Sequence, residues 1–119
     1  MIAGGAPLDF RSLPPTSRLL AYWLGGTRQE VPKLYRLASP AQFVTADDPP
    51  FFFFHGEKDA IVPIVSPASM LKLLQAVQVD TEMYTVLGAG HVGAIFDKEA
   101  WQKALAFLDR RLKDEVASK

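Results

Sequence analysis

The amino-acid sequence predicts an α/β fold in which three parallel strands form a sheet flanked by helices. The main observation is a run of four phenylalanines at residues 51–54 with no polar residue among them. A strand with one face in water would alternate polar and apolar side chains, so this strand is predicted to be buried on both faces. A helical stripe of apolar residues follows the run, and a segment rich in β-branched and aromatic residues follows the helix. Strand, helix and strand in succession predict a parallel pair joined by a right-handed crossover.

The elements before the phenylalanine run are expected to be short. Residues 2–5 are predicted to be the end of a third strand. Apolar residues between 19 and 24 predict a helix that begins after the prolines at 14–15 and ends at the glycines at 25–26. A shorter helical turn around residues 34–37 must end before the next proline, because the residue before a proline avoids the helical region.

The helix after the phenylalanine run is predicted to begin at Ser66, which would cap it, with Pro67 in its first turn. The following strand covers residues 82–87 and ends in the turn at 88–90. A closing amphipathic helix starts near Asp97, with acidic residues in its first turn and basic residues in its last. The stripe of the first helix consists of Met70, Leu71, Leu74 and Val77; that of the second consists of Trp101, Ala104, Leu105, Leu108 and Leu112, with Arg110, Arg111 and Lys113 as its basic residues.

The composition is that of a globular protein and excludes several kinds of function. The 119 residues, 49% of them hydrophobic and 22% charged, suffice for one domain at most. The net charge of +0 makes neither nucleic acid nor an anionic membrane an expected partner. The chain has no cysteine, which excludes disulfides and thiolate catalysis and leaves the compartment open. Its two histidines lack a cluster of carboxylates, so no metal site is expected.

The residues that carry chemistry follow two neighbouring strands, at the end where reactive groups collect in open parallel sheets. Asp59 lies in the loop after the phenylalanine strand, and His91 comes 32 positions later, after the next strand and among glycines that fit a sharply turning loop. Because adjacent strands lie ~5 Å apart, the two side chains can meet. Asp59 would then accept the Nδ1 proton of His91 and leave Nε2 free to take a proton from a nucleophile.

Other residues compete for these two roles. Glu57 could replace Asp59 as the acid, although it comes earlier and its side chain is longer. His55 directly follows the phenylalanine run and is expected to support the loop by hydrogen bonding, with a direct role as the alternative. Taken without any family pattern, Asp59 would more simply be a turn former and His91 a residue of the loop surface.

The motif Pro-Pro-Phe-Phe-Phe-Phe-His-Gly-x-x-Asp-x-x-Val-Pro at 49–63, followed by Gly-Ala-Gly-His at 88–91, resembles the carboxy-terminal third of α/β-hydrolase esterases and lipases. The likeness is to the acetyl-esterase and carbohydrate-esterase group near the prolyl-oligopeptidase branch. It implies that Asp59 is the acid and His91 the base of a Ser-Asp-His catalytic triad. It also implies that the strands are the sixth to eighth of an eight-stranded sheet, and that residues 1–119 are one partial domain. By the same resemblance, Tyr22 and Trp23 could line part of a substrate pocket, but core packing is the favoured interpretation.

The sequence departs from this family pattern because no Gly-x-Ser-x-Gly nucleophile motif occurs in it. The nucleophile half is therefore expected to be absent, which would make the chain a truncated gene product, a cloned fragment or a decayed relative. The resemblance implies a parent serine hydrolase that acts on carboxylic esters, such as acetyl or feruloyl groups on carbohydrate, through an acyl-enzyme and without a cofactor. The isolated chain is expected to be inactive.

The alternative function is that of a non-catalytic remnant that serves as an association module. Residues 2–5 would normally pair with a strand of the missing half. An unpaired strand edge beside apolar surface favours binding of another chain. A homodimer, or a complex with the missing half, is therefore predicted.

Overall fold

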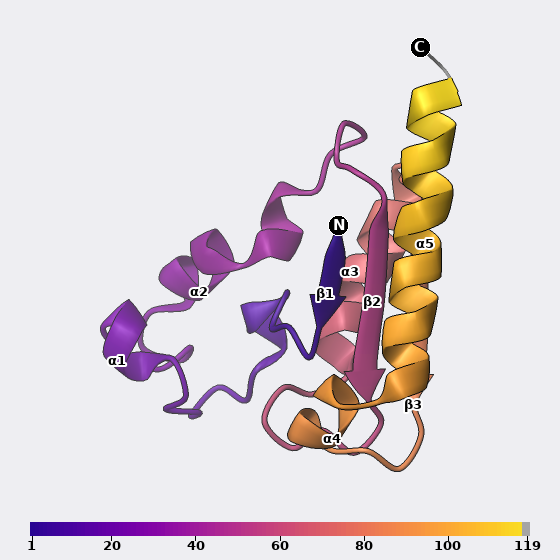
Figure 1. The fold of residues 1–119 in the computed structure, drawn as a ribbon. Coiled ribbons are helices and arrows are strands. Elements are labelled where there is room, and N and C mark those ends of the chain that lie inside the picture. The colour runs from indigo at the N-terminus through magenta and orange to yellow at the C-terminus, as the bar shows by residue number, and fades with distance from the viewer. Residues whose placement is uncertain (118–119) are drawn as a thin grey trace.

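The computed structural model describes residues 1–117, apart from the side chains at 114 and 115. Strands β1 (Ile2–Gly4), β2 (Phe51–Gly56) and β3 (Thr81–Val86) form one parallel sheet in the order β1-β2-β3. The register pairs Gly4 of β1 and Tyr84 of β3 with Phe54 of β2. The predicted three-stranded parallel sheet flanked by helices is therefore confirmed, with the phenylalanine strand at its centre (Figure 1).

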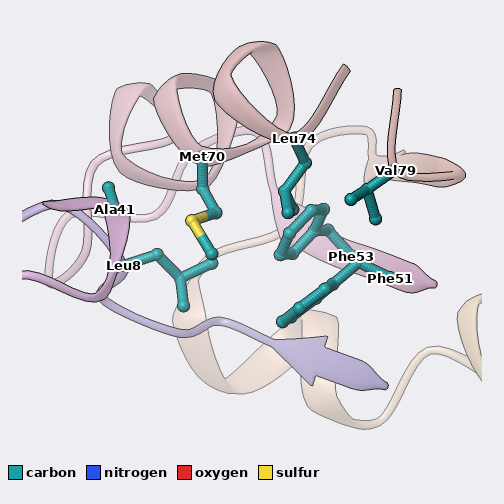
Figure 2. Packing of buried hydrophobic residues seen from close by; sticks show 7 residues of the cluster. All are labelled: Leu8, Ala41, Phe51, Phe53, Met70, Leu74 and Val79. Atoms are coloured by element: carbon teal, nitrogen blue, oxygen red, sulfur yellow. The ribbon is translucent and has the colours of Figure 1, made fainter. Parts of the chain in front are cut away.

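Helices cover both faces of β2, as its unbroken apolar run predicts. Phe51 and Phe53 stack on each other at 5.1 Å between ring centroids and pack under helix α3 (Val65–Ala76), in the cluster drawn in Figure 2. Phe52 and Phe54 point to the opposite face, where helix α5 (Lys98–Ala117) lies along the sheet (Figure 1). Successive side chains of a strand point to opposite faces of the sheet. Because a helix covers each face, all four phenylalanine rings are buried. Burial of each such side chain stabilises the fold by roughly 1.5–3 kcal/mol.

The packing of α5 differs from the predicted stripe. Its buried residues are Ala100, Ala104 and Phe107, whereas Leu105 and Leu112 are 60% and 59% exposed. The physical reason is the bulk of the phenylalanines opposite, because two alanines let the helix approach these rings closely. The helix also continues to residue 117, so its basic residues do not lie in the last turn. Instead, arginines of this helix pair with Glu82 and Asp80 at β3.

The segment between β1 and β2 packs on the core at its two ends, through Leu8 and Ala41, while its helical middle stands away from the sheet (Figure 1). It contains the turns η1 (Phe10–Ser12) and η2 (Pro40–Phe43) and the helices α1 (Ala21–Leu24) and α2 (Pro32–Ala38). The left-handed residue Gly25, at a φ of 79°, ends α1 as predicted, but the helix is only 4 residues long. Tyr22 and Trp23 are 89% and 79% exposed, so the prediction that they pack in the core is wrong.

The predicted capping role of Ser66 is also wrong. Helix α3 begins one residue earlier, its N-cap is Ile64, and no side chain caps it. The Ser66 hydroxyl instead accepts hydrogen bonds from the backbone N–H groups of Leu8 and Asp9, each at 2.9 Å. The serine therefore ties the segment after β1 to the start of α3. Within the described residues, no helix is long and apolar enough to span a bilayer.

Candidate active site

The candidate site lies at the carboxyl ends of β2 and β3, where the short helix α4 (His91–Ile95) begins (Figure 1). His91 is the first residue of this helix and Gly90 is its N-cap, so the predicted loop continues into a helix that the sequence did not indicate. Gly56, at the end of β2, lets the loop after β3 approach the backbone of β2 closely. A Cβ atom on Gly56 would stand 2.5 Å from the Ala89 carbonyl oxygen. The Lys58 N–H donates to the same oxygen at 2.9 Å, which joins the two loops.

Asp59 and His91 are in contact, as predicted. Oδ2 of Asp59 lies 2.7 Å from Nδ1 of His91. An ionised carboxylate only accepts hydrogen bonds, so Nδ1 carries the proton and donates it. The Asp59 side chain is fully buried, whereas that of His91 is 25% exposed. The geometry leaves Nε2 of His91 as the ring nitrogen available to an incoming group.

Backbone groups hold the Asp59 carboxylate in place. Its Oδ1 accepts hydrogen bonds from the N–H groups of Ile61 at 2.9 Å and Val62 at 2.8 Å. Burial by itself raises the pKa of Asp59, but the hydrogen bonds from Val62, His91 and Ile61 outweigh it and hold the pKa below its usual value. Asp59 is therefore ionised at neutral pH, as a group that orients an imidazole must be.

His55 is fully buried beside the same carboxylate. Its Nε2 lies 2.7 Å from the Val62 carbonyl oxygen and 3.2 Å from Oδ2 of Asp59. Both neighbours are acceptors, so Nε2 carries the proton. Nδ1 of His55 is buried and has no hydrogen-bond partner among the described residues. These contacts agree with the predicted support of the loop.

Glu57 takes no part in this contact. Its Oε2 accepts a hydrogen bond from the N–H of Gly88 at 2.8 Å, on the exposed side of the turn. Gly88 has a φ of +70°, which favours glycine at this position. Asp59, and not Glu57, is thus the carboxylate within hydrogen-bond distance of His91.

Sequence reasoning missed the contribution of the first strand to this site. Gly5, directly after β1, lies against the His91 ring, because a Cβ atom on it would stand 3.2 Å from Cε1 of the imidazole. The glycine also has a φ of +61°. The double glycine at residues 4–5 was a visible signal, but nothing local indicated that its neighbour would be a residue far along the chain.

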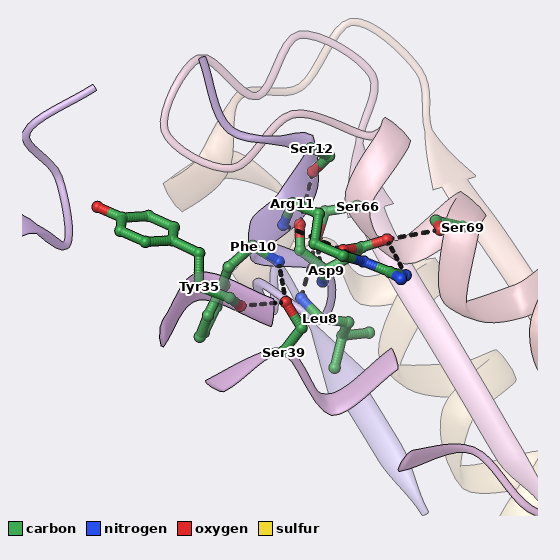
Figure 3. Close-up of polar contacts among 9 residues, drawn as sticks. All are labelled: Leu8, Asp9, Phe10, Arg11, Ser12, Tyr35, Ser39, Ser66 and Ser69. Atoms are coloured by element: carbon green, nitrogen blue, oxygen red, sulfur yellow. Dashed lines mark hydrogen bonds and ion pairs between the residues drawn. The ribbon is translucent and has the colours of Figure 1, made fainter. Parts of the chain in front are cut away.

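A polar cluster centred on Asp9 was also missed (Figure 3). Both Asp9 oxygens accept hydrogen bonds from the Arg11 side chain, at 2.7 and 2.8 Å, and Oδ2 also accepts from Ser69. These bonds from Arg11 and Ser69 outweigh burial and lower the pKa of Asp9. Ser39 accepts from Phe10 N–H and donates to a backbone carbonyl. The cluster fixes the segment after β1. Its serine hydroxyls form hydrogen bonds within the cluster and none with His91.

No group of His, Cys, Asp and Glu residues that could hold a metal ion occurs within residues 1–117 as described. Two histidines lie beside one carboxylate: His91 is hydrogen-bonded to it through Nδ1, whereas Nε2 of His55 lies 3.2 Å from it and is hydrogen-bonded to the Val62 carbonyl. The chemistry of this arrangement is that of an oriented imidazole base.

Comparison with known proteins gives matches to esterases. The BD-FAE family profile matches residues 7–74, which is more than half of the chain. Esterase LipC of Mycobacterium tuberculosis is 41% identical over 95 residues, covering 76% of this chain and 24% of LipC. Esterase LipQ of the same organism is 37% identical over 60 residues, covering 50% of this chain and 14% of LipQ. The chain thus spans about a quarter of the length of LipC.

Solved structures with the same fold are also esterases. A truncated carbohydrate esterase from gut microbiota superposes with a TM-score of 0.81 at 21% identity, over 92% of this chain and 41% of that one. Esterase 2 of Thermogutta terrifontis, phosphoramylated by tabun, gives a TM-score of 0.62 at 28% identity, over 95% of this chain and 40% of the esterase. The fold of this chain is therefore that of part of an α/β-hydrolase.

Proposed function

The chain belongs to the BD-FAE family, with a fold that corresponds to the carboxy-terminal part of an α/β-hydrolase esterase, and on this premise we propose that it supplies the acid and the base of a serine-esterase triad. Asp59 is the acid and His91 is the base. The observation that carries the proposal is the 2.7 Å contact between Oδ2 of Asp59 and Nδ1 of His91, in a family whose named relatives are esterases.

The proposed chemistry follows from the orientation of the His91 ring. With Nδ1 donating to Asp59, the lone pair of Nε2 takes the proton of a serine hydroxyl as its oxygen attacks the ester carbonyl carbon. The same proton then goes to the leaving alcohol as the acyl-oxygen bond breaks. Water repeats the sequence on the acyl-enzyme, releasing the acid and restoring the serine. The serine and the oxyanion donors come from polypeptide outside residues 1–119, so the chain alone is inactive.

The proposed substrates are carboxylic esters. The names of LipC and LipQ support this class of substrate. Acetyl or feruloyl groups on carbohydrate are the finer proposal, as is action on lipid esters. The partly exposed His91 and the buried Asp59 suit a reacting group that arrives from solvent and a carboxylate that stays in place.

A chimera tests this function. In it, the stretch of LipC that matches this chain is replaced by residues 1–119, and everything else is LipC. The expected result is hydrolysis of p-nitrophenyl acetate that falls by about 10⁴-fold on Asp59→Asn and by about 10⁶-fold on His91→Ala. Glu57→Gln is the matched carboxylate control and is expected to leave the rate unchanged. A folded chimera without esterase activity, or one that keeps its rate without His91, would contradict the proposal.

The 119-residue chain itself gives a second test. It is expected to hydrolyse p-nitrophenyl acetate no faster than buffer, because it brings no oriented serine to Nε2 of His91. Turnover by the isolated chain that disappears on His91→Ala would overturn this part of the proposal.

A second candidate function is association, as a homodimer or with the missing half of the hydrolase. The observation that favours it is the position of β1, which pairs only with β2 in the described sheet and leaves its other edge open. Large apolar side chains are exposed elsewhere, including Leu87 at 79% and Phe96 at 78%. Open edges and apolar surface both favour binding of another chain.

Proline at Ile2 tests this association. The carbonyl of Met1 and the N–H of Gly5 bond to β2, so by the alternation of a parallel ladder the N–H of Ile2 faces the open edge. Ile2→Pro removes this outward donor and keeps the bonds to β2. The expected result is an oligomer by light scattering at micromolar concentration that dissociates in the variant. A monodisperse monomer of the unaltered chain would contradict the candidate.

A further inference from the structure

A concave site lies between η1 and α2, on the segment that joins β1 to β2. Its volume is about 470 Å³, and its lining consists of Arg11, Arg28, Pro32, Lys33, Tyr35 and Arg36. Four of these six residues are cations, and no carboxylate lines the cavity. None of the residues of the Asp59–His91 site takes part in it. The cavity is therefore a distinct and strongly basic feature of a chain whose net charge is +0.

The charges around this cavity are unbalanced. Arg11 is the exception, since both oxygens of Asp9 bind its guanidinium (Figure 3). No ion pair within the described part of the chain neutralises Arg28, Lys33 or Arg36. The nearby Glu30 turns elsewhere, because its Oε2 accepts from the N–H and the hydroxyl of Thr27. Three like charges at one concavity repel each other, so their convergence raises the energy of the unliganded site.

Arg28 gives an independent indication of a missing ligand. Its Nε is buried and has no hydrogen-bond partner among the described residues. A buried donor without an acceptor costs free energy, and native structures seldom leave one unsatisfied. An anion in the cavity would supply the acceptor as well as the counter-charge.

We propose that this cavity binds a small molecule with two or more negative charges, carried by phosphate or carboxylate groups. Guanidinium groups match both oxyanions with paired hydrogen bonds, and the lysine adds a mobile point charge. The size falls within the roughly 300–1,000 Å³ of small-molecule sites. Tyr35 gives the cavity a fixed wall, since it is fully buried and its hydroxyl donates to the Gly26 carbonyl at 3.2 Å.

The test titrates the 119-residue chain with pyrophosphate, citrate and acetate, followed by ¹H–¹⁵N correlation spectra and calorimetry. Shifts are expected at amides of residues 28–36 with pyrophosphate or citrate, and acetate is expected to bind much more weakly. The tighter of the first two ligands identifies the site as one for phosphate or for carboxylate groups. Lys33→Gln and Arg36→Gln are expected to weaken binding about tenfold each, the loss of one charge-assisted hydrogen bond.

Lys72→Gln is the matched control. Lys72 is exposed on α3, so this substitution removes one positive charge outside the cavity. It is expected to leave the affinity unchanged. Lys33 and Arg36 are exposed as well, so their variants keep the fold, and their unliganded spectra check this. The proposal is overturned if neither polyanion shifts the amides of the cavity, if acetate binds as tightly, or if Lys72→Gln weakens binding as much as the cavity variants. His91→Ala is expected to leave this binding intact, which separates it from the proposed esterase function.

Discussion

Asp59→Asn perturbs the proposed acid–base pair at its carboxylate. It keeps the size of the side chain and removes its charge. The new amide oxygen still accepts from the N–H groups of Ile61 and Val62, now as a neutral acceptor. The amide nitrogen replaces Oδ2 and presents a donor to Nδ1 of His91, 2.7 Å away, and to Nε2 of His55, 3.2 Å away. Nδ1 of His91 thus meets a donor in place of its acceptor, whereas Nε2 of His55 keeps its hydrogen bond to the Val62 carbonyl.

The magnitude follows from the bonds that change. A hydrogen bond to a charged group contributes ~1.5–3 kcal/mol and a neutral one ~0.5–1.5 kcal/mol. The variant weakens two hydrogen bonds from the backbone and loses the one to His91, but it no longer has to desolvate a buried charge. We expect the net effect to be a free energy of unfolding that is lower by about 2–3 kcal/mol at pH 7. The pKa of Asp59 is lowered in the fold, so its contribution is fully present above the unfolded value of ~3.9 and is lost as the pH falls through the folded value. The deficit of the variant is therefore largest at neutral pH and shrinks in acid.

Urea unfolding followed by circular dichroism at several pH values between about 7 and 3 measures this effect. Glu57→Gln is the control, because Glu57 is exposed and accepts one hydrogen bond, from Gly88. It is expected to cost less than about 1 kcal/mol. The reasoning is refuted if Asp59→Asn costs no more than this control, or if its cost is the same at pH 3 as at pH 7.

Three further predictions concern the residues that position the site, all measured by urea unfolding. Gly56→Ala places a methyl group 2.5 Å from a backbone oxygen of the next loop and is expected to cost about 1–3 kcal/mol; Gly93→Ala, whose nearest contact is 3.6 Å, should cost nothing, and equal effects would be evidence against the close loop contact. Ser66→Ala leaves two buried N–H groups without their acceptor and is expected to cost about 2–3 kcal/mol, a value that a merely capping serine would not reach. Phe53→Ala empties the centre of a fully buried cluster and is expected to cost about 3–5 kcal/mol, against less than about 0.5 kcal/mol for the exposed Tyr22→Ala; comparable losses would contradict the assigned burial.

The features that the sequence predicted rest on local patterns. The phenylalanine run indicated a strand covered on both faces, and both faces are covered, because a period of two leaves no polar side for water. The contact between Asp59 and His91 could be predicted because neighbouring parallel strands end at the same edge of the sheet. Their contact needed only the strand order and the lengths of two loops.

The features that were missed depend on partners distant in sequence. A serine at a helix start can cap the helix or accept hydrogen bonds from another segment. The N–H groups that donate to Ser66 lie 57 and 58 residues away in the sequence. The predicted stripe of α5 included Ala104, which is buried, but its leucines at 105 and 112 are exposed, because the large rings of β2 select Ala100 and Phe107 in their place. The exposure of Trp23 follows from the position of its segment away from the sheet, which no periodicity within the segment could indicate.

The tautomers of the two histidine rings test the central claim most directly. Long-range ¹H–¹⁵N correlation at about pH 8 identifies which nitrogen of each ring carries a proton. The account predicts a proton on Nδ1 of His91 and on Nε2 of His55, with the preference of His91 lost in Asp59→Asn. A proton on Nε2 of His91 in the unaltered chain, or a tautomer that does not change when the carboxylate is removed, would contradict it.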